Sequence, residues 1–145
     1  MQDLPTGERM TTPAQQVTDG FESTGCNRGD AERAVLSYYR LVDDEKFVDL
    51  IQLFAPAAEY RRPGYEPFIG RPALMDFYYR QRVITRGRHS ISSLVVDHRT
   101  VAVRGRFTGA TRGGGSVNLR FADFFVLDSS GLFAARETFF FVPSV

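Results

Sequence analysis

The sequence is poor in the residues that many binding and catalytic sites require. Its 145 residues include one cysteine, two histidines and no tryptophan. Cys26 alone forms no intrachain disulfide, and with only His89 and His98 beside it the chain offers no cluster for a metal, so we expect neither a metal nor a cofactor. A formal net charge of +1 favours neither nucleic acid nor an anionic membrane as a partner.

Long apolar runs are also lacking. No segment approaches the roughly 20 apolar residues that span a bilayer. The N-terminal segment is polar and lacks the apolar centre of a secretory signal. We therefore expect a cytoplasmic protein with no membrane association.

Hydrophobic residues, and phenylalanine in particular, are abundant in the sequence. Hydrophobic residues make up 43% of it, with 13 phenylalanines, and the length suits one domain with its own core. Residues 1–29 mix proline and glycine with polar residues and show no periodicity, which predicts a flexible tail. Residues 30–145 are expected to form the single folded domain.

The hydrophobic spacing predicts three helices, a short strand and four long strands. Asp30 suits the cap of a first helix that ends near Asp43, and a second helix has apolar residues up to Phe54. Residues 57–62 predict a short strand, and Pro72 suits the first turn of a third helix. The period then changes to two, which predicts strands at 89–96, 100–108, 117–127 and 132–142. This order indicates an α+β fold, with helices packed on a strongly curved, mostly antiparallel sheet.

Asp123 is the most informative residue of the predicted strands. It shares one face of its strand with Val117, Leu119, Phe121, Phe125 and Leu127. Because side chains alternate between the faces of a strand, Asp123 should point into the core. A carboxyl group among phenylalanines loses hydration in its charged form, so its pKa should rise. The alternative is a structural acid paired with Arg136 or Arg104.

Four segments together resemble the nuclear-transport-factor-2-like superfamily, and within it the steroid isomerases and SnoaL-type polyketide cyclases. They are residues 38–41 (Tyr-Tyr-Arg-Leu), 50–55, 69–74 (Ile-Gly-Arg-Pro-Ala-Leu) and 121–125 (Phe-Ala-Asp-Phe-Phe). The resemblance covers about residues 30–142. It implies a cone-shaped α+β barrel that encloses a pocket, but members of the superfamily differ in reaction, so the fold does not settle the function.

The isomerase pattern implies roles for three positions. Tyr38 falls on the oxyanion-hole tyrosine and Asp123 on a protonated aspartic acid, a pair that would polarise a substrate carbonyl. Arg62 occupies the position of the general-base carboxylate. An arginine does not accept a proton at neutral pH, so the isomerase route is disfavoured. Glu59 and Glu66 are second-rank bases, and Arg62 either binds a substrate carboxylate or pairs with one of them.

Other residues complete the candidate site. Glu137 would form an acid pair with Asp123 if it faced inward, as epoxide hydrolysis requires. His89 would serve as a pocket base or remain a strand-edge histidine without a required partner. The residues expected to contact substrate, besides Arg62, are Phe54, Tyr60, Phe77, Phe125, Thr138 and Phe140.

Two surfaces suggest partners. Phe139, Phe140 and Phe141 place large rings on both faces of the last strand, and a two-fold homodimer through the sheet would cover the outer one. The basic run of Arg80, Arg82, Arg86 and Arg88 predicts a solvated face, with docking of an acidic carrier protein as the alternative.

The leading hypothesis is a cofactor-independent cyclase acting on a hydrophobic polyketide-like molecule in antibiotic-type biosynthesis. A Diels–Alder-type closure suits a site with carbonyl polarisation and no base. An aldol-type closure needs a base, which would be His89 or Glu59. The alternatives are an isomerase, an epoxide hydrolase, or a non-catalytic domain that binds small molecules.

Overall fold

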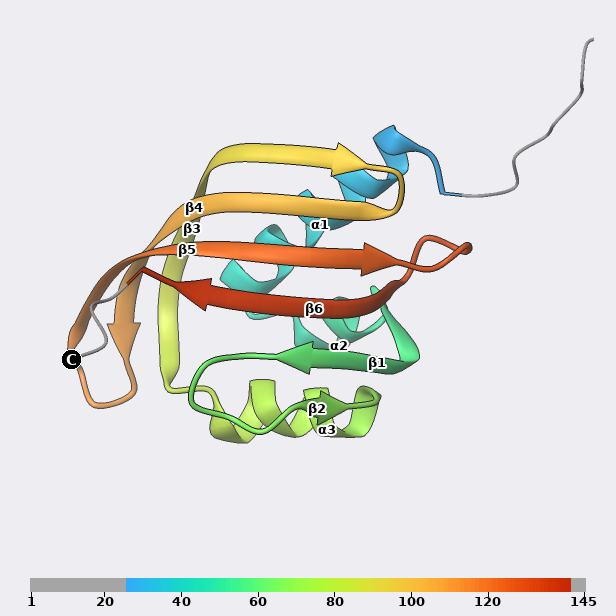
Figure 1. The fold of residues 1–145 in the computed structure, drawn as a ribbon. Coiled ribbons are helices and arrows are strands. Elements are labelled where there is room, and N and C mark those ends of the chain that lie inside the picture. Colours follow the sequence, from blue (N-terminus) through green and yellow to red (C-terminus); the bar gives the residue numbers. More distant parts are fainter. Residues whose placement is uncertain (1–25, 142–145) are drawn as a thin grey trace, which may run out of the picture.

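The computed structural model describes residues 26–141, in which helices pack against one six-stranded sheet (Figure 1). The helices are α1 (Arg28–Asp43), α2 (Phe47–Ile51), α3 (Arg71–Asp76) and the π-helical turn η1 (Phe77–Gln81). The strands are β1 (Phe54–Arg61), β2 (Phe68–Ile69), β3 (Ile84–Asp97), β4 (Thr100–Thr111), β5 (Ser116–Leu127) and β6 (Phe133–Phe140). Their order in the sheet is β2-β1-β6-β5-β4-β3, and every pair is antiparallel except β1 with β6.

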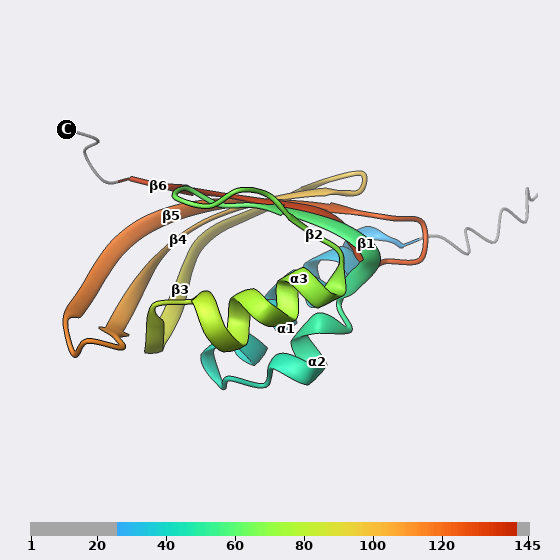
Figure 2. The same ribbon diagram turned by 90° about the horizontal axis from the view of Figure 1, so that it is seen from below.

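The sheet is strongly curved, and α1, α2 and α3 lie on its concave side (Figure 2). Buried apolar side chains from the helices and from the inner face of the sheet form one core between these layers. This is the cone-shaped α+β architecture of nuclear-transport-factor-2-like proteins, and the predicted fold class is confirmed. Among the described helices, none is both long and apolar enough to cross a membrane.

Glycines let β3 and β4 bend where their backbones come close together. A Cβ on Gly109 would lie 2.0 Å from the carbonyl oxygen of Arg86, and one on Gly105 would lie 2.4 Å from that of Ser90. The β3–β4 register also shifts near Ile84 and again near Ile91. Bulges of this kind increase the local bend and twist of a strand. The curvature closes the sheet around the helices and creates the cavity described below.

Several predicted element bounds were wrong. Asn27, not Asp30, caps α1, because the Asn27 side chain accepts a hydrogen bond from the Asp30 backbone N–H at 2.9 Å. The second helix ends at Ile51, and Phe54 begins β1 instead of continuing the helical stripe. The first long strand starts at Ile84, earlier than expected. Residues 1–25 of the predicted tail and the predicted strand end at 142 lie outside the described residues.

Alternation along β5 follows the prediction. Phe121, Asp123, Phe125 and Leu127 are all buried, and Asp123 is only 1% exposed. The residues between them point to the outer face, where Phe124 is 44% exposed. The strand therefore delivers one carboxyl group into the core from a strictly alternating sequence.

Candidate active site

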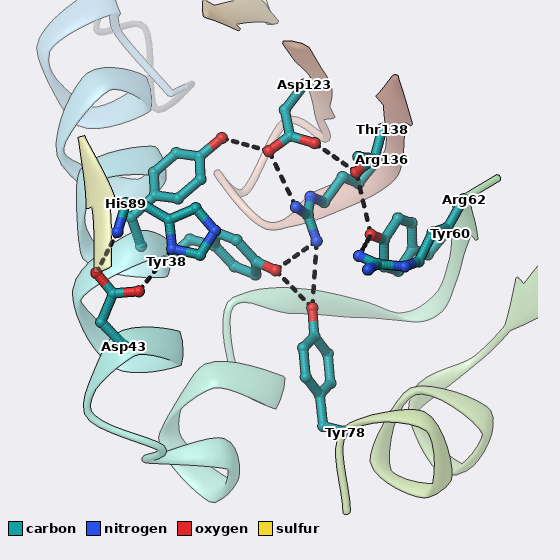
Figure 3. Close-up of polar contacts among 10 residues, drawn as sticks. Tyr38, Asp43, Tyr60, Arg62, Tyr78, His89, Asp123, Arg136 and Thr138 are labelled. Atoms are coloured by element: carbon teal, nitrogen blue, oxygen red, sulfur yellow. Dashed lines mark hydrogen bonds and ion pairs between the residues drawn. The ribbon is translucent and has the colours of Figure 1, made fainter. Parts of the chain in front are cut away.

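A buried ion pair lies at the centre of the site (Figure 3). Asp123 on β5 is directly opposite Thr138 on β6, and Arg136 lies two residues before Thr138. Nη2 of Arg136 donates to Oδ2 of Asp123 at 2.9 Å, and the hydroxyl of Tyr39 from α1 donates to the same oxygen at 2.5 Å. The Thr138 hydroxyl donates to Oδ1. Asp123 therefore accepts hydrogen bonds from three donors, one of them a cation.

This pattern corrects the expectation of a neutral Asp123 that donates a hydrogen bond to substrate. All three hydrogen bonds of Asp123 are accepted from protein donors, one of them a guanidinium, so the carboxyl group is engaged inside the protein. Asp123 forms the buried pair with Arg136 that was the alternative interpretation. Arg104, the other proposed partner, is exposed and donates to Ser93 instead.

Two tyrosines share the other end of the Arg136 guanidinium. Nη1 of Arg136 donates to the hydroxyl of Tyr38 and, at 3.3 Å, to that of Tyr78. The two phenolic oxygens lie 2.6 Å apart, so one of their two protons forms this bond and the other stays available for a substrate oxygen. Burial raises the pKa of Tyr38 well above its ordinary value, although the charge of Arg136 opposes the rise. Both phenols are thus neutral donors held beside a cation, an arrangement suited to a developing oxyanion.

His89 and Asp43 form a second polar pair in the same region. Nδ1 of His89 lies 2.5 Å from Oδ1 of Asp43, and the His89 backbone N–H donates to Oδ2 at 2.9 Å. A carboxylate partner at Nδ1 places the proton there and leaves Nε2 as an acceptor. Burial lowers the pKa of His89 below its ordinary value, although the bond to Asp43 opposes this. The far edge of the ring points toward Arg136 in Figure 3.

Except for Tyr39 and Asp43, which lie behind the lining, these groups face one cavity inside the cone. The space between the lining side chains, its mouth included, is about 410 Å³, of which about 30 Å³ admits the centre of a water molecule. That interior holds one or two waters. Tyr38, His89 and Asp123, the predicted catalytic residues, all line it.

Of the predicted substrate contacts, three line the cavity and four do not. Arg62, Thr138 and Phe140 are in the lining. The other four are buried in the core around it, and they are Phe54, Tyr60, Phe77 and Phe125. Phe54 packs on Tyr38 and Phe133, whereas Tyr60 supports the site through a 3.0 Å hydrogen bond to Thr138.

The glutamates considered as bases do not reach the cavity. Glu59 pairs with Arg61 on the outside of β1 at 2.8 Å, and Glu66 is exposed. Glu137 is exposed on β6, so it forms no acid pair with Asp123. Within residues 26–141, no group of three His, Cys, Asp or Glu side chains could hold a metal ion.

Sequence reasoning missed three residues of the site. Asp43 was interpreted only as a helix terminus, and Tyr78 only as part of a helical face. Arg82 was placed in a solvated basic run, yet it is 6% exposed and lines the cavity. The sequence did hold one signal for Arg82. The helical pattern ends before this residue, so its side chain need not lie on the exposed face of the helix with the other arginines.

The fold and the cavity define a nuclear-transport-factor-2-like protein with an internal polar site. The SnoaL-like domain family matches residues 35–135, and the chain belongs to that family. A search of curated proteins finds no match.

Solved structures support the same fold. A putative SnoaL-like polyketide cyclase from Jannaschia sp. CCS1 is 17% identical, with a TM-score of 0.69 over 78% of this chain and 86% of that one. SalBIII, described as an epoxide hydrolase/cyclase-like enzyme in pyran ring formation in the polyether salinomycin, is 17% identical, with a TM-score of 0.71 over 79% and 92%. TerC, co-crystallised with polyporic acid, is 18% identical, with a TM-score of 0.67 over 77% and 91%.

Proposed function

We propose that this chain is a cofactor-independent cyclase that closes a carbocycle by an aldol-type step on a polyketide-like compound. The observation that carries the proposal is the His89–Asp43 pair in the same cavity as the Tyr38–Tyr78–Arg136 cluster. One end of the cavity offers a proton acceptor, and the centre offers donors for an oxyanion. Membership of the SnoaL-like family is consistent with this chemistry.

The reaction follows from these positions. Nε2 of His89 takes a proton from the carbon beside a carbonyl, and the C–H electron pair becomes the C=C bond of an enolate. Its oxygen accepts a hydrogen bond from the free phenolic proton of the Tyr38–Tyr78 pair, with the charge of Arg136 close by. The enolate carbon attacks a second carbonyl of the same molecule, and the new alkoxide takes the proton back from His89. No proton or electron is left over.

Asp43 positions this base. Its two oxygens hold both the ring and the backbone N–H of His89, which fixes the tautomer and the ring orientation. Burial keeps the pKa of His89 low, so the ring is neutral and ready to accept a proton at pH 7. With a base in the cavity, the aldol-type route is favoured over the base-free Diels–Alder-type closure expected from the sequence.

The other enzymatic hypotheses fit this arrangement less well. Isomerisation by the steroid isomerase route needs a carboxylate where Arg62 lies. Epoxide hydrolysis needs acids that activate water and protonate the epoxide oxygen, but Asp123 is already engaged by Arg136, Tyr39 and Thr138. The non-catalytic binding domain remains the rival from another class, and the experiment below separates the two.

Ring closure of 2,6-heptanedione in D₂O, followed by NMR, tests the proposal. The full chain should accelerate both deuterium uptake beside the carbonyls and formation of the six-membered ring. His89→Gln should lower both rates by about 10²- to 10⁴-fold, the usual contribution of a general base. His98→Gln is the matched control, because His98 is exposed in a turn, and it should leave the rates unchanged. Rates equal to buffer, or equal in the chain and in His89→Gln, would refute the proposal and favour the binding domain.

A further inference from the structure

The cavity holds more positive charge than its carboxylates balance. Among the described residues, Arg62, Arg82 and Arg136 line it together with one carboxylate, Asp123, which pairs with Arg136. Within residues 26–141, no carboxylate forms an ion pair with Arg62 or Arg82. Asp43 is outside the lining and is bound to His89. One half-buried cation, Arg62, and one buried cation, Arg82, are therefore left without a counter-ion in this part of the chain.

Arg62 is held rigidly with part of its guanidinium unsatisfied. Its charge lies over the rings of Phe77 and Phe140, with 5.4 Å and 4.9 Å to their centroids. Nη1 donates to the Tyr60 hydroxyl at 3.3 Å. Nε is buried and has no hydrogen-bond partner. The guanidinium thus packs on two aromatic rings, and its Nε lacks the hydrogen bond that a buried donor normally makes.

Arg82 follows η1 and adds a second charge to the same cavity. It is 6% exposed, and its side chain makes no hydrogen bond within the described part of the chain. Burial lowers the pKa of Arg82, and the nearby charge of Arg62 lowers it further. An arginine nevertheless stays protonated in proteins. A buried charge without a partner costs several kcal/mol, and an anion in the cavity would offset that cost.

We propose that the substrate carries a carboxylate, which Arg62 and Arg82 bind. This inference rests on the proposed function for the position of the reacting carbon. Figure 3 shows Arg62 and His89 on opposite sides of Arg136. The carboxylate would therefore bind at the β1 side while the carbonyl lies at Tyr38 and the acidic C–H faces His89. The planar guanidinium matches a planar carboxylate, which it can bind through two parallel hydrogen bonds.

Calorimetric titration of the full chain with 5-oxohexanoate and with its methyl ester tests the inference. The ester replaces the negative charge by a neutral ester group and adds one methyl group. We expect the acid to bind at least 10-fold more tightly than the ester. Arg62→Gln and Arg82→Gln should each weaken binding of the acid by about 10- to 150-fold, the range of hydrogen bonds to charged groups, and leave the ester unchanged.

Matched controls lie next to each arginine. Arg61→Gln and Arg80→Gln remove the same charge from exposed positions and should leave binding unchanged. Equal binding of acid and ester, or wild-type affinity in both cavity variants, would overturn the inference. If a variant fails to fold by circular dichroism, the comparison of acid and ester on the native chain decides alone.

The same probes separate this inference from the proposed function. Tight binding of the acid without deuterium uptake beside its carbonyl would refute the proposed reaction and support the carboxylate site. Equal uptake and equal binding for acid and ester would support the reaction and refute the carboxylate site.

Discussion

Replacing Asp123 by asparagine should destabilise the protein far more than its small change in shape suggests. The amide keeps the volume of the side chain and still accepts a hydrogen bond from Tyr39 or Thr138. It removes the carboxylate that pairs with Arg136, whose side chain is 5% exposed. Arg136 stays charged, so the variant buries an uncompensated cation.

The expected magnitude follows from the burial of the pair. Breaking a buried ion pair by removing one partner costs about 3–5 kcal/mol, a large fraction of the roughly 5–15 kcal/mol that stabilises a domain. Urea unfolding followed by circular dichroism measures it. With a slope of about 2 kcal/mol/M, a loss of 4 kcal/mol lowers the midpoint by about 2 M.

A double variant supplies the control. Asp123→Leu combined with Arg136→Met removes both charges and should recover most of the lost stability, because apolar replacement of a whole buried pair is often neutral. The reasoning is refuted if Asp123→Asn costs less than about 1 kcal/mol, or if the double variant is no more stable than Asp123→Asn.

Three further outcomes follow from the structure. Burial lowers the pKa of His89 in the folded protein. The contribution of neutral His89 to stability should therefore be complete above pH 6.5, the ordinary pKa of histidine, and should decline as the pH falls toward the lower folded-state pKa. His89→Gln should flatten this part of a profile of stability against pH. Gly105→Ala places a methyl group 2.4 Å from the Ser90 carbonyl oxygen and should cost about 1–3 kcal/mol in urea unfolding, whereas Gly113→Ala, with no atom nearer than 3.9 Å, should cost less. A homodimer through the sheet should dissociate in Phe124→Lys, measured by light scattering, because this ring is 44% exposed on the outer face; an unchanged mass would exclude that interface.

The sequence predicted the position of Asp123 because the alternation of β5 is strict. In a strand, a residue whose neighbours two positions before and after it are buried must point to the same buried face of the sheet. The hydrogen-bond partners of Asp123 were harder to predict, because one of them is Arg136, which belongs to another strand. Pattern reasoning named Arg136 as a partner but had no measure of how close the two side chains come.

The His89–Asp43 pair shows where sequence reasoning fails. The two residues are 46 positions apart, and their contact depends on how the end of α1 packs against β3. Asp43 at a helix terminus is an ordinary feature of sequence, and His89 at a strand start is equally ordinary. Neither pattern indicates the other, so only the packed structure identifies the pair.

The resemblance to steroid isomerases placed a base at the end of β1, and this chain has Arg62 there instead. In the proposed reaction this substitution does not remove the base, because His89, held by Asp43 on the other side of Arg136, would accept the proton (Figure 3). A substrate would then lie in the reverse sense, with its acidic carbon toward β3 and its anionic group toward β1. The two changes fit together. A carboxylate base at position 62 would repel a negatively charged substrate group there, whereas Arg62 attracts it and His89 takes over as the base.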